Sequence, residues 1–142
     1  MRMLLRKLLH YQTLDNTTNW ALLILRVGVS FFLMYHGFEK LENLLAGNSA
    51  DFPDPFHVGA RASHGLSVFA EFLCSAFLML GLFSRFALII LICNMLIIIF
   101  IIHAADPLTD REHAYLFLIP FISLFLTGPG AFSLDAFIFK KP

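Results

Sequence analysis

Long apolar runs separated by short polar stretches dominate the chain from residue 20 onward. Most of these runs approach the roughly 20 residues that an α-helix needs to cross the hydrocarbon core of a bilayer. The pattern therefore predicts an all-α membrane protein, a bundle of four transmembrane helices at residues 20–41, 66–83, 86–102 and 114–127. All four belong to one domain, since 142 residues leave room for no more than one.

The segments between these helices differ in kind. Residues 46–63 contain two prolines and several small polar residues, which predicts a true loop. Residues 82–85 form a tight turn, so the second and third helices should pair as an antiparallel hairpin. Gly128-Pro129-Gly130 should end the fourth helix, because proline lacks a backbone donor and glycine tolerates the helix exit. Residues 1–12 and 132–142 are predicted as short interfacial segments at the two termini.

The basic residues are unevenly distributed about this topology, and their distribution predicts its orientation. Six lie on the side of the termini: Arg2, Arg6, Lys7, Arg85, Lys140 and Lys141. Three lie on the opposite side: Lys40, Arg61 and Arg111. Because cytoplasmic segments carry the excess of lysine and arginine, both termini should face the cytoplasm.

Composition supports a lipid environment. Hydrophobic residues make up 58% of the chain, more apolar surface than a soluble domain of this size could hide. Ten basic residues balance ten acidic ones, so the net charge favours no nucleic-acid partner. The expected partner is the bilayer itself, together with a protein partner or a second copy of the chain.

Ionisable side chains interrupt the first predicted helix. At about 100° per residue, Arg26 and Lys40 lie on one face with His36 and Gly37 close to the same stripe. Arg26 would sit near the cytoplasmic end and point back toward it. Two interpretations of Arg26 stay open, a snorkelling contact with lipid phosphates or a packing contact within the bundle.

The opposite, outer end of the bundle collects the other candidates. Glu71 on the second helix would lie roughly 8 Å below the outer face, at the depth of His36 and Lys40. These depths argue against an Arg26–Glu71 ion pair. His103 ends the third helix on the same side. The sequence therefore predicts an outer polar pocket of His36, Lys40, Glu71 and His103.

Several chemistries fit that pocket. A histidine there could carry protons, ligate a metal or donate to a quinone oxygen, although interfacial hydrogen bonds to backbone or lipid are the simpler interpretation. No histidine spacing matches a metal-binding signature, so no metal site is predicted. Cys74 and Cys93 fall at similar depth on adjacent helices and are either a redox pair or two small apolar residues. Asn94 is expected to make an interhelical hydrogen bond.

The segments LRVGVSFFLMYHGFEKL, AEFLCSAFLMLGLFSR and EHAYLFLIPFISLFLTGPGAFSLDAF, in this order, resemble the DoxX family of small four-helix bacterial inner-membrane proteins. By this resemblance the family's characteristic positions are Arg26, His36, Gly37, Lys40, Glu71, Gly81, Arg85, His103 and the turn 128–135. The resemblance implies a link to quinone, thiol or sulfur redox chemistry. The outer pocket and the resemblance together give as catalytic candidates Glu71, His36, Lys40 and His103, and as cofactor-binding candidates Arg26, His36, Lys40 and Glu71.

Three functions remain open on the sequence. The first is an oxidoreductase-associated membrane subunit that binds a quinone or a small sulfur substrate in the outer pocket. No flavin or haem motif is present, so no cofactor other than a quinone is expected. The second is a non-enzymatic assembly partner in a membrane complex. The third is a small-solute or proton pathway.

Overall fold

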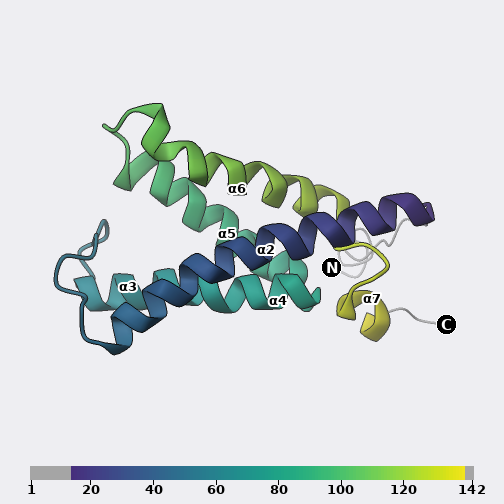
Figure 1. Ribbon diagram of the computed structural model, residues 1–142, viewed down its shortest axis with the longest axis horizontal. Coiled ribbons are helices and arrows are strands. Elements are labelled where there is room, and N and C mark those ends of the chain that lie inside the picture. Colours follow the sequence, from purple (N-terminus) through teal and green to yellow (C-terminus); the bar gives the residue numbers. More distant parts are fainter. Residues whose placement is uncertain (1–13, 140–142) are drawn as a thin grey trace, which may run out of the picture.

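The computed structural model describes residues 14–139, and within them all regular structure is helical. Four helical rods lie alongside one another, and a short helix follows them (Figure 1). The rods are α2 (Asn16–Leu45), the continuous run of α3 (Ala60–Val68), η1 (Phe69–Cys74) and α4 (Ser75–Leu80), the run of α5 (Ser84–Ile97) and η2 (Ile98–Ile102), and α6 (Leu108–Thr127). The short helix is α7 (Leu134–Phe139). The predicted interfacial segment at residues 1–12 lies outside the described residues.

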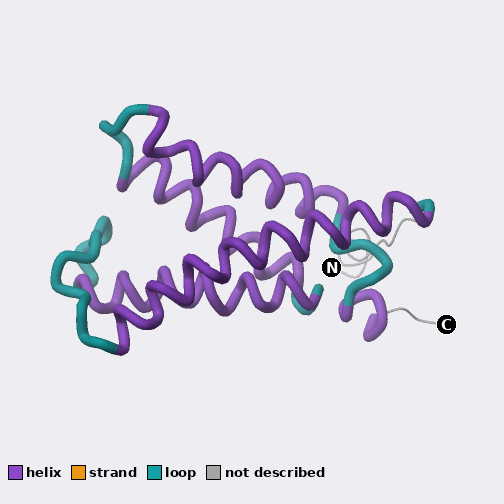
Figure 2. The backbone as a smooth tube through the Cα atoms, in the orientation of Figure 1, coloured by secondary structure: helices purple, strands orange, loops and turns teal. Residues whose placement is uncertain are grey.

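Two sets of connections define the ends of the bundle (Figure 2). We call the end with residues 46–59 and 103–107 the loop end. We call the end with residues 81–83 and 128–139 the turn end. The chain passes between these ends four times, so successive rods are antiparallel.

Three rods are long and apolar enough to cross a membrane: Asn16–Leu45, Ala60–Leu80 and Ser84–Ile102. The all-α prediction is thus confirmed, and each of the first three predicted spans matches one of these rods. The fourth rod, α6, has 20 residues and carries Asp110, Arg111 and Glu112 close to its start.

The predicted helix bounds were too narrow at several ends. α2 begins at Asn16 because Asp15 caps it, accepting a hydrogen bond from Thr18 N at 3.2 Å. The second rod begins at Ala60, which shortens the predicted 46–63 loop. α6 begins at Leu108 rather than Ala114, since the acidic Asp110 in its first turn favours a helix N-terminus.

Glycines end the second and fourth rods at the turn end, which was predicted for Gly128 but not for Gly81. Gly81 adopts the left-handed conformation with φ 70° and closes α4, so the second helix stops at Leu80 rather than Phe83. Gly128, with φ 84°, ends α6. The tight turn between the second and third rods is confirmed at residues 81–83.

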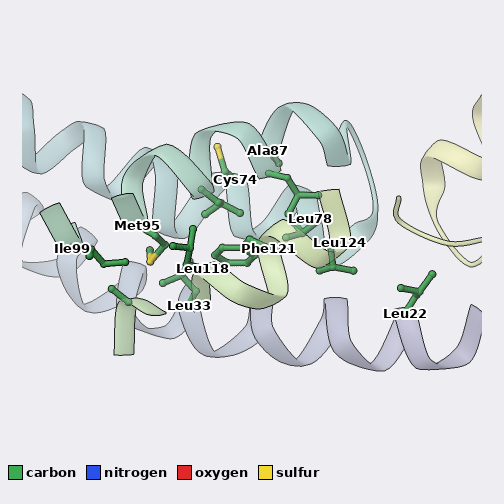
Figure 3. Close-up of a cluster of buried hydrophobic side chains, with 13 residues drawn as sticks. Leu22, Leu33, Cys74, Leu78, Ala87, Met95, Ile99, Leu118, Phe121 and Leu124 are labelled. Atoms are coloured by element: carbon green, nitrogen blue, oxygen red, sulfur yellow. The ribbon is translucent and has the colours of Figure 1, made fainter. Parts of the chain in front are cut away.

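The core lies where the four rods meet. Figure 3 shows it as an apolar cluster to which every rod contributes, and Phe121 lies at its centre in that view. Leu78, Leu88, Leu91, Phe121 and Leu124 are fully buried. Most large apolar side chains on the opposite faces of the rods are exposed, which suits helices that contact lipid on the outside.

Candidate functional site

A partly buried ion pair joins α2 to η1. Lys40 Nζ donates a hydrogen bond to Glu71 Oε1 at 2.6 Å. The Glu71 side chain is only 3% exposed, whereas that of Lys40 is 30% exposed. The predicted proximity of Lys40 and Glu71 is confirmed.

Two neutral side chains complete the environment of this carboxylate. Asn94 Nδ2 on α5 donates to Glu71 Oε1 at 3.0 Å, which confirms the interhelical hydrogen bond expected of Asn94. Ser67 Oγ donates to the same oxygen at 3.3 Å and accepts from Lys40 Nζ at 3.1 Å. Glu71 Oε1 therefore receives all three hydrogen bonds, and among residues 14–139 no donor reaches Oε2. We call Lys40, Ser67, Glu71 and Asn94 the polar cluster.

Close backbone packing brings the pair together. A Cβ atom at Gly37 would lie 2.5 Å from Phe72 N and 2.6 Å from the Glu71 carbonyl carbon, so α2 and η1 touch at this point. Lys40 follows Gly37 by almost one helical turn and thus reaches Glu71 across the contact. Glu71 itself lies in a π-helical segment, a wider turn that is often found at functional sites.

The two histidines predicted for the pocket do not join the polar cluster. His36 is exposed on α2, and its ring contacts those of Tyr35 and Phe117, each with centroids 6.3 Å apart. His103, at the end of η2, pairs its Nδ1 with Asp106 Oδ2 at 2.7 Å. The prediction that both histidines meet Glu71 was wrong, because each has a nearer partner in its own surroundings.

A different histidine is buried at the loop end. His64 is 2% exposed, its Nδ1 lies 3.0 Å from Ser49 Oγ, and the Phe52 ring stacks on it at 4.2 Å. Next to it, Asp54 accepts hydrogen bonds from Ser63 Oγ at 2.6 Å and from two backbone amides at the start of α3. The hydrogen bond from Ser63 holds the pKa of Asp54 below its ordinary value. These contacts fix residues 46–59 against the helices.

Arg26 lies at the turn end and is buried, with 2% of its surface exposed. Its Nη1 donates to the Pro129 carbonyl and its Nη2 to the Phe132 carbonyl, both at 2.7 Å. The lipid-phosphate interpretation of Arg26 is therefore wrong, and the packing interpretation is confirmed. As a cofactor-binding candidate Arg26 is far from the polar cluster, since it lies almost four helical turns before Lys40.

The two cysteines and the apolar groove beside the ion pair are not part of the polar cluster. Cys74 is buried in the core, Cys93 is exposed, and both are free thiols. Since one faces the core and the other faces outward, the structure does not support a redox pair. An open groove lined by Phe31, Met34, Tyr35, Phe38 and Phe72 is entirely apolar, and no member of the polar cluster lines it.

The polar cluster can hold a proton or a small anion. Lys40 offers a positive charge that is partly accessible, and Glu71 offers a carboxylate in a low-dielectric setting. No group of three or more metal-ligating side chains gathers within residues 14–139. Sequence reasoning missed the role of Ser67, although its i, i+4 spacing to Glu71 was a usable signal. It also missed Asn94 as the partner of Glu71.

A bundle of helices of this hydropathy, with an ion pair between two of them, defines an integral membrane protein with a polar candidate site. The DoxX family model matches residues 21–104, which is more than half of the chain and includes Arg26 and the whole polar cluster. The chain belongs to the DoxX family, as its resemblance predicted. Neither a curated protein nor a solved structure matches it.

Proposed function

We propose that the chain is a redox-associated membrane subunit whose Lys40–Glu71 pair exchanges protons with a bound quinone or small sulfur compound. The observation that carries this proposal is a carboxylate with 3% exposure, bonded to three donors inside a bundle of apolar helices. An ionisable group within a membrane helix costs about 2.5–3.5 kcal/mol on insertion scales, so its presence favours a functional role.

Each member of the polar cluster has a role in this proposal. Lys40 stabilises negative charge on the ligand, and Glu71 takes up or releases the proton. Ser67 and Asn94 are positioning residues, because they hold Glu71 Oε1 and leave Oε2 to accept a proton. The electrons that reduce the quinone come from a partner subunit or from the sulfur compound that is oxidised, and the chain supplies the proton-exchanging site.

The membrane placement is part of the same proposal. All four rods, α6 included, cross the bacterial inner membrane, with the turn end in the cytoplasm and the loop end outside. The distribution of lysine and arginine along the chain supports this orientation. A membrane-impermeant maleimide applied to intact cells should label an Asp51→Cys variant and not a Lys140→Cys variant. The unmodified chain is the control, because Cys74 and Cys93 lie within the rods. The reverse labelling would overturn the orientation.

The redox role is tested by a variant that changes one atom of the pair. Glu71→Gln keeps the shape of the side chain and removes the exchangeable carboxylate. We expect cells with Glu71→Gln to lose most quinone-linked oxidation that depends on this chain, and purified protein to lose pH-dependent binding of a quinone analogue. Glu39→Gln, at an exposed position of α2, is the matched control. Equal activity of both variants and the unmodified chain would reject the role.

A second candidate function is that of an assembly partner in a membrane complex. It is favoured by Phe56 and Val58, which are exposed in the loop between α2 and α3, outside the rods. The contacts of Asp54 and His64 hold this loop in place, as a docking surface requires. Crosslinking through Val58→Cys in native membranes should then recover a different protein. Recovery of this chain alone would count against the assembly role.

A further inference from the structure

The hairpin turn between α4 and α5 holds an aromatic residue in an unusual conformation. Phe83 has φ 48° and ψ 38°, a left-handed geometry that bulky residues rarely adopt. Asp135 stabilises it: Oδ1 accepts from Phe83 N and Oδ2 from Ser84 N, both at 2.8 Å. The Phe83 ring nevertheless remains 56% exposed. The left-handed backbone of Phe83 therefore directs this side chain outward at a cost in backbone strain.

Other exposed apolar side chains surround the same end of the molecule. Phe132 is 41% exposed and lies 4.8 Å from the ring of Trp20, which is 52% exposed. On α7, Phe137 is 85% exposed and Ile138 is 56% exposed. We call Trp20, Phe83, Phe132, Phe137 and Ile138 the turn-end apolar surface. It lies at the turn end, where α7 stands apart from the other helices (Figure 1).

This surface is firmly attached to the bundle. Arg26 holds the Pro129 and Phe132 carbonyls, and Asn19 Oδ1 accepts from Ala131 N at 2.8 Å. Asp135 N in turn donates to the Gly81 carbonyl at 2.8 Å. These polar contacts hold the backbone of residues 129–135 in place, and the apolar side chains at this end stay exposed.

The charges near this surface indicate what covers it. Lys140 and Lys141 follow α7 directly in the sequence, and Arg85 lies in the first turn of α5. Asp135 is 8% exposed and engaged by two amides, so it offers little opposing charge. An apolar surface whose last helix continues in the sequence into two lysines matches the boundary between acyl chains and anionic headgroups.

We propose that the turn-end apolar surface anchors the chain in a lipid leaflet and selects anionic phospholipid. The rings enter the region between headgroups and acyl chains, where aromatic side chains are favoured. The positive charge at this end of the sequence attracts the phosphates. The proposal rests on the proposed membrane placement only in requiring a bilayer surface at this end, and it holds for either leaflet.

Lipid selectivity provides the first test. Full-length protein in a mixture of phosphatidylglycerol and phosphatidylcholine is analysed by native mass spectrometry for retained lipid. A Lys140→Gln/Lys141→Gln double variant should lower the preference for phosphatidylglycerol by about 30-fold, as expected for two lysines at an anionic surface. Arg61→Gln, which neutralises an exposed cation at the loop end, should leave the preference unchanged. An unchanged preference in the double variant would overturn the proposal.

A second variant tests how much the apolar side chains contribute to lipid retention. Phe137→Ser should reduce retention of both lipids alike, whereas the lysine variant changes only their ratio. Leu108→Ser, at an exposed position of the loop end, is its matched control. Equal losses in the two serine variants would show that Phe137 has no special role, and would contradict the anchor.

The fluorescence of Trp20 reports directly on what covers the turn-end apolar surface, since Trp20 is the chain's single tryptophan. In nanodiscs, lipids brominated near the glycerol backbone should quench its emission more strongly than lipids brominated at the chain ends. Protection from both lipids and from acrylamide would instead show that a second protein copy covers this surface, and would reject lipid as its occupant. Neither result depends on quinone chemistry, so failure here and failure of the redox role are distinguishable.

Discussion

Lys40 Nζ and Glu71 Oε1 lie 2.6 Å apart and connect α2 to η1 within an apolar bundle. The two partners differ in exposure, with side chains 30% and 3% exposed. Desolvation therefore penalises the carboxylate more than the ammonium group. Lys40 is the charged donor to Glu71 Oε1, and Ser67 and Asn94 are its neutral donors.

This asymmetry predicts unequal effects of removing either partner. Lys40→Met leaves a buried carboxylate without its cation and should lower the free energy of unfolding by about 2–4 kcal/mol. Glu71→Gln should cost only about 1 kcal/mol, because the amide oxygen still accepts hydrogen bonds and Lys40 can extend toward the surface. Denaturant-induced unfolding in mild detergent measures both.

A paired replacement provides the control for this prediction. A Lys40→Met/Glu71→Leu double variant replaces the ion pair by apolar groups of similar size, which is often neutral for stability. We expect it to be more stable than Lys40→Met alone. If Lys40→Met and Glu71→Gln lower the free energy of unfolding equally, the difference in exposure does not determine the effect of removing either partner.

Gly37 predicts a steric effect at the same helix contact. In Gly37→Ala the new methyl group would meet Phe72 N at 2.5 Å, a backbone atom that cannot rotate away. We expect a loss of about 1–3 kcal/mol in the free energy of unfolding from overpacking. Gly28→Ala is the matched control, since no atom lies within 4 Å of its Cβ position. It should stabilise the same helix by about 0.5–1 kcal/mol. Equal effects of the two substitutions would disprove the close contact.

The sequence predicted the rods well because apolar periodicity and glycine exits act locally. It also placed Lys40 and Glu71 at one depth, since helix rise alone determines that relationship. The predicted contact between His36 and Glu71 was wrong because neighbouring residues point about 100° apart on a helix. Gly37, which follows His36, is the residue that faces η1. The π-helical geometry around Glu71 has no local sequence signal.

The contacts of Arg26 could not be predicted from the sequence for a different reason. Its acceptors, Pro129 O and Phe132 O, lie more than one hundred residues later in the chain and are backbone atoms without a side-chain signature. Depth and direction correctly placed Arg26 at the turn end. They did not reveal that the segment after α6 folds back over it.

Substitution of Arg26 should lower the free energy of unfolding even when the positive charge is kept. Its planar fork spans two carbonyls, whereas a lysine ammonium is a single point of donation. Arg26→Lys should therefore cost about 1.5–3 kcal/mol, the value of one hydrogen bond to a charged group. Hydrogen exchange of the amides in residues 129–135 should accelerate in this variant. Arg61→Lys, at an exposed site, should change neither quantity. Unchanged exchange in Arg26→Lys would show that the second carbonyl contact does not hold this segment.

Asp54 predicts a pH dependence at the loop end. The hydrogen bond from Ser63 lowers its pKa from the ordinary value of 3.8, so the folded state binds its proton less tightly than the unfolded state. The resulting stabilisation is present above pH 3.8 and is lost as the pH falls through the lower, folded-state pKa. The unfolding temperature of the native chain should therefore exceed that of Asp54→Asn near neutral pH, and the two should converge in acid. Asp51→Asn, in the same loop and exposed, controls for the loss of one charge. A constant difference between the native chain and Asp54→Asn down to strongly acid pH would show that the ionised carboxylate does not stabilise the loop before α3.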